Sequence, residues 1–131
     1  MGVSWSFDCE TLYFNSKVGD NFEHLEYLKK ISDGNNIEAV VLEQLNFFRN
    51  AKTVRQLLLK TGYVAYSLTS NPQFISTLSP RKWLGCKTKQ DVFNLLSYYG
   101  CTNNDESDSL ALLLFFIKKK DMEVKIEKGT L

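Results

Sequence analysis

The sequence is poor in the side chains that most catalytic and metal sites require. It has one histidine, His24, and three cysteines, Cys9, Cys86 and Cys101, with no C-x-x-C pair among them. An odd number of widely spaced cysteines disfavours both a disulfide framework and a zinc site. The sequence also lacks a G-x-S-x-G motif and a phosphate-binding Walker loop. We therefore expect a protein that is not an enzyme, with no catalytic residues, no metal ligands and no cofactor.

Strong net charge and long apolar runs are also missing. Sixteen basic and fifteen acidic residues leave a net charge of +1, which argues against a protein held on nucleic acid mainly by bulk charge. The longest apolar run, Leu110 to Ile117, is too short to cross a bilayer, and the first residues do not resemble a signal peptide. Reduced cysteines then favour an intracellular protein, cytoplasmic or nuclear, with no membrane contact.

The sequence does contain enough apolar material for a folded core. Its 131 residues are 44% hydrophobic and include nine phenylalanines and six tyrosines. This length predicts a single domain over residues 1–131. So many large rings predict a well-filled core and an aromatic contact surface.

Residues 37–48 predict the first of two central helices. Apolar side chains recur at intervals of four, four and three residues, at Ile37, Val41, Leu45 and Phe48. This spacing is one stripe of an α-helix. Further apolar residues widen the stripe beyond that of a surface helix, so we expect this helix to be buried.

Residues 54–61 predict the second central helix. Thr53 is a suitable N-cap, and Gln56 follows three residues later, as in a capping box. Gly62 offers the positive φ that commonly ends a helix. The two helices are expected to form a buried helical hairpin with the remaining chain packed around it.

Two other helices have clear local start and stop signals. Asp20 predicts the start of a helix that ends in the polar turn at residues 33–36. Thr88 and Asp91 predict the start of a second helix, which Gly100 closes.

Shorter helical segments are predicted between these helices. Residues 63–71 fit either a third helix or a short strand, and we predict the helix because a helix precedes them. Two prolines predict short helical turns over residues 72–78 and 80–84, the second ended by Gly85. His24 has acidic neighbours and is expected on the exposed side of its helix.

The two ends of the chain predict a small sheet. Residues 3–14 alternate as a strand, with a bulge or turn near Glu10. The apolar run 110–117 fits a buried helix or a central strand. We predict the strand, paired in a hairpin with residues 122–127 and preceded by a solvated acidic loop over 102–109.

Together these elements predict a mostly α protein of the α+β class. We expect a multi-helix bundle around the central helical hairpin. A small antiparallel β element, formed by the N- and C-terminal segments, completes the expected fold.

Two short motifs lie near the amino end. Residues 1–6, Met-Gly-Val-Ser-Trp-Ser, fit the loose N-myristoylation pattern at Gly2, but no basic cluster supports anchoring, and we predict an unmodified strand. Residues 7–11, Phe-Asp-Cys-Glu-Thr, resemble the first motif of DEDD-type exonucleases, in which a strand-borne Asp and Glu bind two metal ions. We do not find the further acidic residues of such enzymes, so we expect Asp8 and Glu10 to be a solvent-facing pair on a strand.

Residues 53–70 resemble a helix-turn-helix. In that family a capped helix is followed by a glycine turn nine residues after the cap, and a second helix reads the major groove. Thr53 matches the cap and Gly62 the turn. The second helix has no basic residue, and its apolar side chains favour burial instead. The resemblance implies DNA binding through exposed side chains, namely Arg55, Lys60, Tyr66, Ser67 and Ser70.

The same stretch also resembles the helical bundle at the amino end of transcription elongation factor TFIIS and its relatives. Those domains carry a Leu-rich helix, a Thr-capped helix that ends near a second Thr, and a late Trp. The matching residues here are Leu42, Leu45, Thr53, Leu57, Thr61 and Trp83. This resemblance implies binding of short disordered peptides from transcription proteins.

We therefore expect a non-enzymatic protein–protein interaction module, either a peptide-binding adaptor or a subunit of a larger assembly. Balanced charge, abundant aromatic residues and the lack of a catalytic set favour this interpretation. The alternative is a DNA-binding helix-turn-helix protein over residues 53–70. A protein partner is thus expected, and nucleic acid is the second candidate.

Overall fold

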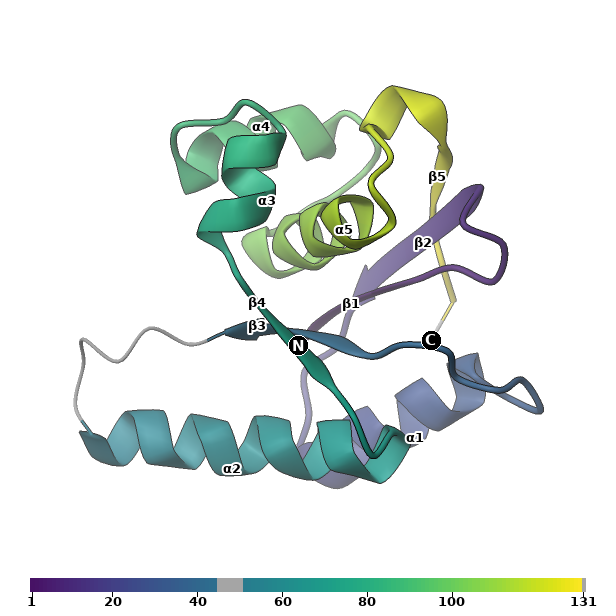
Figure 1. Cartoon of the computed structure of the whole chain (residues 1–131), viewed down its shortest axis with the longest axis vertical. Coiled ribbons are helices and arrows are strands. Elements are labelled where there is room, and N and C mark those ends of the chain that lie inside the picture. The colour runs from purple at the N-terminus through teal and green to yellow at the C-terminus, as the bar shows by residue number, and fades with distance from the viewer. Residues whose placement is uncertain (45–50, 131) are drawn as a thin grey trace. The chain divides into compact units, whose positions relative to one another are not determined.

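The computed structural model describes residues 1–44 and 51–130, and the chain divides into two compact units (Figure 1). The terminal unit comprises Met1–Val18 and Thr77–Leu131, and the central unit comprises Gly19–Ser76. The expected single domain stays a prediction.

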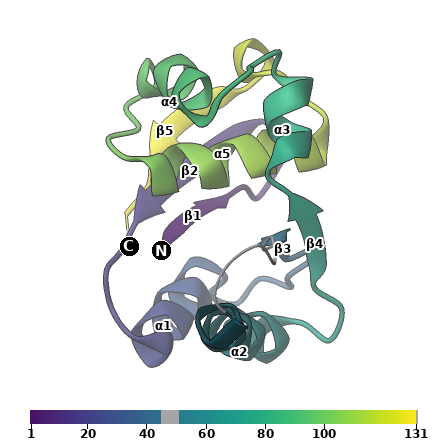
Figure 2. The ribbon, with the colours of Figure 1, turned by 90° about the vertical axis from the view of Figure 1, so that its left-hand side faces the viewer.

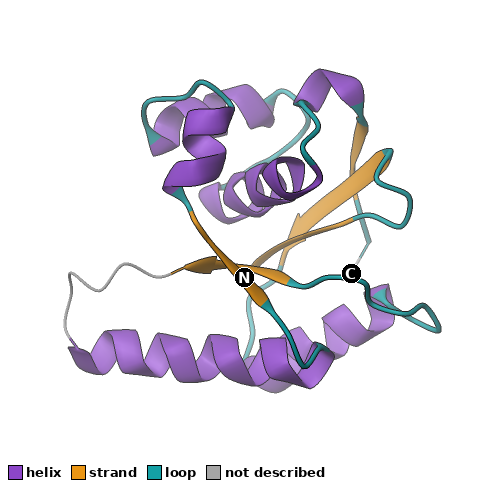
Figure 3. Ribbon diagram, viewed as in Figure 1, coloured by secondary structure: helices purple, strands orange, loops and turns teal. Residues whose placement is uncertain are grey.

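The terminal unit is built on a mixed sheet in the order β1–β2–β5. Figure 3 draws the strands in orange. β1 (Gly2–Trp5) and β2 (Thr11–Ser16) form an antiparallel hairpin, and β5 (Lys125–Lys128) lies parallel to β2. Residues 6–10 form the turn between β1 and β2. Of the bulge or turn predicted near Glu10, the structure has a turn, which lies over residues 6–10 and separates two strands where one was expected.

Helices pack on this sheet and on one another (Figure 2). α5 (Asn104–Ile117) lies against β1 and β2, whereas α3 (Leu78–Trp83) and α4 (Lys89–Ser97) pack on α5. The short 3-10 helix η1 (Asp121–Glu123) precedes β5. Alternate residues of β2 point into the core. The buried core consists of Leu12, Phe14, Val92, Leu96, Cys101, Leu110, Ala111 and Leu114.

Helices with strong local signals form as predicted. The Thr88 side chain accepts a hydrogen bond from Asp91 N, and the Asp91 carboxylate accepts one from Thr88 N, so a complete capping box starts α4. Gly100, with φ of 104°, follows its end. Gly85, with φ of 76°, follows α3 in the same way. Such caps depend only on neighbouring residues, which is why the sequence is sufficient to predict them.

The predicted hairpin of residues 110–117 with 122–127 is wrong, because the first segment belongs to α5. The Asn103 side chain accepts a hydrogen bond from Glu106 N at 2.9 Å and caps that helix. The acidic residues assigned to a solvated loop are therefore mostly the first turns of α5, where carboxylates are favoured by the helix dipole. The C-terminal strand also pairs in parallel, not in the predicted antiparallel direction.

The central unit contains a strand–helix–strand motif. β3 (Val41–Gln44) and β4 (Gln73–Ser76) pair in parallel, and α2 (Ala51–Leu68) connects them. Parallel neighbours require such a crossover, because a tight turn can join only antiparallel strands. α1 (Asn21–Ile31), the helix predicted to start at Asp20, packs beside α2.

The predicted multi-helix bundle around a central helical hairpin is wrong, because the strands are not confined to the ends of the chain. Val41 lies in β3 rather than in a helix, and Leu45 and Phe48 lie outside the described residues. β-Branched residues fit a pleated strand well, and pairing with β4 satisfies the β3 backbone. The helical turn predicted over 72–78 is likewise largely the strand β4.

The predicted break at Gly62 is also wrong. α2 begins at Ala51, before Thr53, and continues through Gly62 to Leu68. A glycine inside a helix costs only about 1 kcal/mol relative to alanine. The residues on both sides of Gly62 favour a helix enough to offset this cost, so α2 continues without a break. Residues 63–68 are helical, as predicted.

Replacing Gly62 by alanine should stabilise the central unit by about 0.5–1 kcal/mol, because alanine has less backbone freedom to lose on folding. A Cβ at this position would meet no atom within 4 Å. The measurement is the midpoint of thermal unfolding followed by far-ultraviolet circular dichroism. The matched control is Gly100→Ala, which should destabilise because Gly100 has φ of 104°. A lower midpoint for Gly62→Ala would instead indicate a turn at residue 62.

Candidate functional site

The central unit exposes apolar side chains along α2. Leu59, Tyr63 and Tyr66 stand at i, i+4 and i+7, so they share one helix face. Their exposed fractions are 69%, 41% and 62%. Val64 and Ala65, on other faces of the same helix, are buried. α2 therefore packs one apolar surface inside the protein and leaves a second one in solvent.

Phe22 of α1 extends this exposed surface. The Asp20 side chain accepts a hydrogen bond from Glu23 N at 2.9 Å and starts α1, which places Phe22 in the first turn. The ring centroids of Phe22 and Tyr63 lie 5.8 Å apart, yet Phe22 remains 70% exposed. We refer to Phe22, Leu59, Tyr63 and Tyr66 as the apolar ridge.

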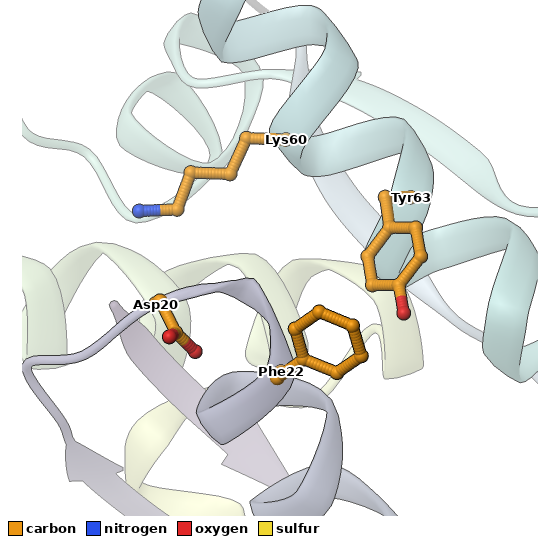
Figure 4. A pocket seen from close by; sticks show the side chains of 4 residues that line it. All are labelled: Asp20, Phe22, Lys60 and Tyr63. Carbon is orange, nitrogen blue, oxygen red and sulfur yellow. The ribbon is translucent and has the colours of Figure 1, made fainter.

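An open pocket lies beside the Phe22–Tyr63 ring pair (Figure 4). Its volume is about 460 Å³, and its lining residues are Asp20, Phe22, Lys60 and Tyr63. The two rings stand at one end, while the Asp20 carboxylate and the Lys60 ammonium stand at the other. Enclosed small-molecule sites bury most of their ligand, which an open pocket of this kind does not. The pocket is better suited to one side chain of a bound polypeptide.

The charge along α2 has a single sign. This helix carries Lys52, Arg55 and Lys60 and no acidic residue, and all three basic side chains are exposed. Acidic side chains lie instead at the start of α1, at Asp20 and Glu23. Basic side chains therefore lie on the same helix as the three ridge residues that α2 contributes.

The residues predicted for the helix-turn-helix alternative are all exposed but do not form that motif. Lys60 lines the pocket, and Tyr66 belongs to the apolar ridge. Arg55 is exposed earlier on α2, and Ser70 lies beyond the end of the helix. The Ser67 hydroxyl donates to the Tyr63 carbonyl of its own helix at 2.6 Å. These side chains lie on or just beyond one continuous helix rather than on two.

The sequence prediction missed three ridge residues, Phe22, Leu59 and Tyr63. Their signal was present, because Leu59, Tyr63 and Tyr66 have helical spacing. Apolar residues at that spacing usually face a core, and the expected burial of this segment is correct for Val64. It is wrong for Tyr63, because spacing shows which residues share a face but not what covers the face.

Asp8 and Glu10 lie in the β1–β2 turn, not on a strand as predicted. Asp8 Oδ1 accepts hydrogen bonds from Glu10 N and Thr11 N, both at 2.9 Å. The Thr11 bond, followed by the Glu10 bond, lowers the pKa of the Asp8 carboxyl. Asp8 thus stabilises the turn through its hydrogen bonds. Within residues 1–44 and 51–130, no group of three or more His, Cys, Asp or Glu side chains is placed to hold a metal ion.

Of the other candidate nucleophiles and bases, His24 and Cys101 are buried, Cys86 is partly buried and Cys9 is exposed. His24, predicted to be exposed, is only 3% exposed because its side of α1 faces the protein interior. All three cysteines are free thiols. Burial raises the pKa of the Cys101 thiol to about 12, and burial is also the main cause of the raised pKa of Cys86. Both thiols are therefore protonated near neutral pH and are poor nucleophiles.

No protein-family model matches the chain, and a search of curated proteins finds no significant match. In the described part of the chain, none of the helices combines the length and the apolar character needed to span a bilayer.

Proposed function

We propose that this chain is a non-enzymatic protein–protein interaction module and that the apolar ridge is its binding surface. The observation that carries the proposal is the exposure of Leu59, Tyr63 and Tyr66 on one face of α2, continued by Phe22. Contiguous exposed apolar surface commonly marks a site of protein contact. Tyrosine is also among the residues that contribute most to binding free energy at such contacts.

The partner is a polypeptide that covers these rings. An exposed aromatic side chain has few rotatable bonds, so it loses little conformational entropy when it is buried at an interface. The adjoining pocket receives one partner side chain between Phe22, Tyr63 and the polar groups of Asp20 and Lys60. The three free cysteines favour an intracellular setting for this contact.

DNA binding by a helix-turn-helix has less support. That motif requires two helices with a turn between them, and α2 is continuous through Gly62. The exposed basic side chains of Arg55 and Lys60 are the remaining observation that fits DNA binding. They also suit the rim of a protein interface.

Photo-crosslinking tests the binding surface. A photoreactive residue at Tyr66 should give a discrete adduct in a lysate of the source organism. The same residue at Tyr98, which is 87% exposed on the terminal unit, should give none. Adding Leu59→Ala and Tyr63→Ala should remove the Tyr66 adduct, because losing one such contact residue typically costs about 2 kcal/mol of binding free energy. Alanine preserves helix propensity, and circular dichroism would verify the fold. Equal adducts at Tyr66 and Tyr98 would contradict the proposal.

A further inference from the structure

The exposed face of α2 is cationic at its amino-terminal end and apolar at its carboxyl-terminal end. Arg55, Leu59, Tyr63 and Tyr66 follow one another at intervals of four, four and three residues, so they form one continuous row on the helix. The amino-terminal end of this row is cationic, and Lys52, three residues before Arg55, continues it. The carboxyl-terminal end consists of the exposed apolar side chains.

We propose that the apolar ridge takes a partner segment that is acidic at one end and apolar at the other. This inference rests on the proposed function and names the chemistry of its partner. The apolar end of the segment covers Leu59, Tyr63 and Tyr66, and its carboxylates lie over Arg55. Lys60, on the wall of the pocket, meets a further carboxylate.

The length of the row sets the size of the segment. Tyr66 lies eleven positions after Arg55, which corresponds to about 16 Å along a helix at about 1.5 Å per residue. A partner helix of about three turns, or an extended peptide of about five residues, spans that distance. The partner can therefore be a short segment that orders on binding rather than a whole folded face.

Charge complementarity favours this segment over a second copy of the chain. A second α2 has no carboxylate to place over Arg55 or Lys60, because the helix lacks acidic residues. Two such helices packed in parallel would bring cations toward cations, and packed antiparallel they would place Arg55 over apolar side chains of the other copy with no carboxylate to meet it. The acidic group of α1 that reaches the site, Asp20, lines the pocket beside Lys60 and Tyr63, at the apolar half of the row. Carboxylates of the partner segment therefore bind at the Arg55 end of the row.

Three synthetic probes test this partner class by fluorescence anisotropy with the full chain. The first is a helical peptide with leucine and phenylalanine at i, i+3, i+4 and i+7 in one half and glutamates in the other. The second has lysine in place of each glutamate, and the third is a single-stranded oligonucleotide. We expect the glutamate peptide to bind on the order of tenfold tighter than the lysine peptide at low salt.

Charge reversal provides the matched comparison. Arg55→Glu with Lys60→Glu should reverse the preference, so that the lysine peptide binds more tightly. Lys82→Glu with Lys87→Glu makes the same change in net charge at exposed positions of the terminal unit and should leave the preference intact. Tyr63→Ala should weaken both peptides, because it removes apolar contact that they share.

Several outcomes would overturn the proposal. These are equal binding of the two peptides, tighter binding of the oligonucleotide, loss of the preference in the Lys82 and Lys87 control, or no binding of either peptide. A dimer in sedimentation that Arg55→Glu with Lys60→Glu abolishes would make a second copy the occupant instead. The crosslink at Tyr66 is a separate measurement. If it persists while the peptides fail, the interaction function stands and only the partner's chemistry is wrong.

Discussion

Replacing Phe14 by alanine should destabilise the terminal unit by about 3–5 kcal/mol. Phe14 is completely buried in β2, within the core that the sheet shares with α4 and α5. Its ring also reaches Gly100, where a Cβ would stand 3.5 Å from the ring. Truncation removes the transfer free energy of the ring and leaves a cavity between elements that are far apart in sequence, so the cost falls on the whole unit.

Tryptophan fluorescence during urea unfolding measures this effect. Both tryptophans of the chain, Trp5 and Trp83, belong to the terminal unit, so the signal reports that unit. The matched control is Phe7→Ala in the β1–β2 turn, because Phe7 is 61% exposed. Its ring makes an edge-to-face pair with the Tyr13 ring, with the centroids 6.4 Å apart, and its loss should cost less than about 1 kcal/mol. Equal unfolding midpoints for the two variants would show that the core is not where the structure places it.

Replacing Glu106 by glutamine should be the second most damaging change, at about 1–3 kcal/mol. Glu106 is only 1% exposed, and its carboxylate joins three separate segments. Oε1 accepts hydrogen bonds from Thr102 N at 2.9 Å and Thr102 Oγ1 at 3.0 Å, while Oε2 accepts one from Ser16 Oγ at 2.9 Å. Lys128 Nζ of β5 lies 3.9 Å from Oε2. An amide in the same place offers one acceptor oxygen instead of two and carries no charge.

The pH dependence of stability provides a sharper test of Glu106. Burial raises the pKa of this carboxyl, but hydrogen bonds from Thr102 and Ser16 and the charge of Lys128 outweigh burial, so the pKa lies below the ordinary 4.5. A carboxyl with a lowered folded pKa contributes stability that is fully present above its unfolded pKa. That contribution is lost as the pH falls through the folded pKa. The difference in unfolding free energy between wild type and Glu106→Gln should therefore be constant above about pH 5 and shrink below 4.5.

The control for this measurement is Glu10→Gln. Glu10 is an exposed acidic residue of the β1–β2 turn, so other segments do not enclose its side chain as they enclose that of Glu106. Its stability curve should follow the wild-type curve closely at every pH. Should the Glu106→Gln curve stay parallel to the wild-type curve down to strongly acidic pH, the Glu106 carboxylate would not be stabilised by its neighbours in the folded protein.

Less of the candidate site than of the helices could be predicted from the sequence. Lys60 and Tyr66 were identified as exposed, although for a DNA-binding motif that α2 does not form. Phe22 and Tyr63 were missed because their proximity depends on how α1 packs beside α2. No local pattern contains that information, since the two residues are forty-one positions apart.

Helix starts and stops that depend only on neighbouring residues could be predicted from the sequence alone. Asp20 caps α1, Thr88 with Asp91 caps α4, and Gly100 follows α4, because each feature closes hydrogen bonds within a few residues. The β1–β2 turn is also local, since Asp8 forms it with adjacent backbone, but the alternating pattern of the segment predicted Asp8 and Glu10 on a strand instead.

Elements that need a partner far away in the sequence could not be predicted in this way, because their conformation depends on tertiary contacts. Residues 41–44 are a strand because residues 73–76 pair with them. β5 pairs in parallel with β2, although the two strands lie near opposite ends of the sequence. A local apolar pattern cannot distinguish a buried helix from a paired strand, since both bury similar side chains. Burial of Glu106 likewise depends on Ser16 and Lys128 arriving from either end of the sequence to bind one carboxylate.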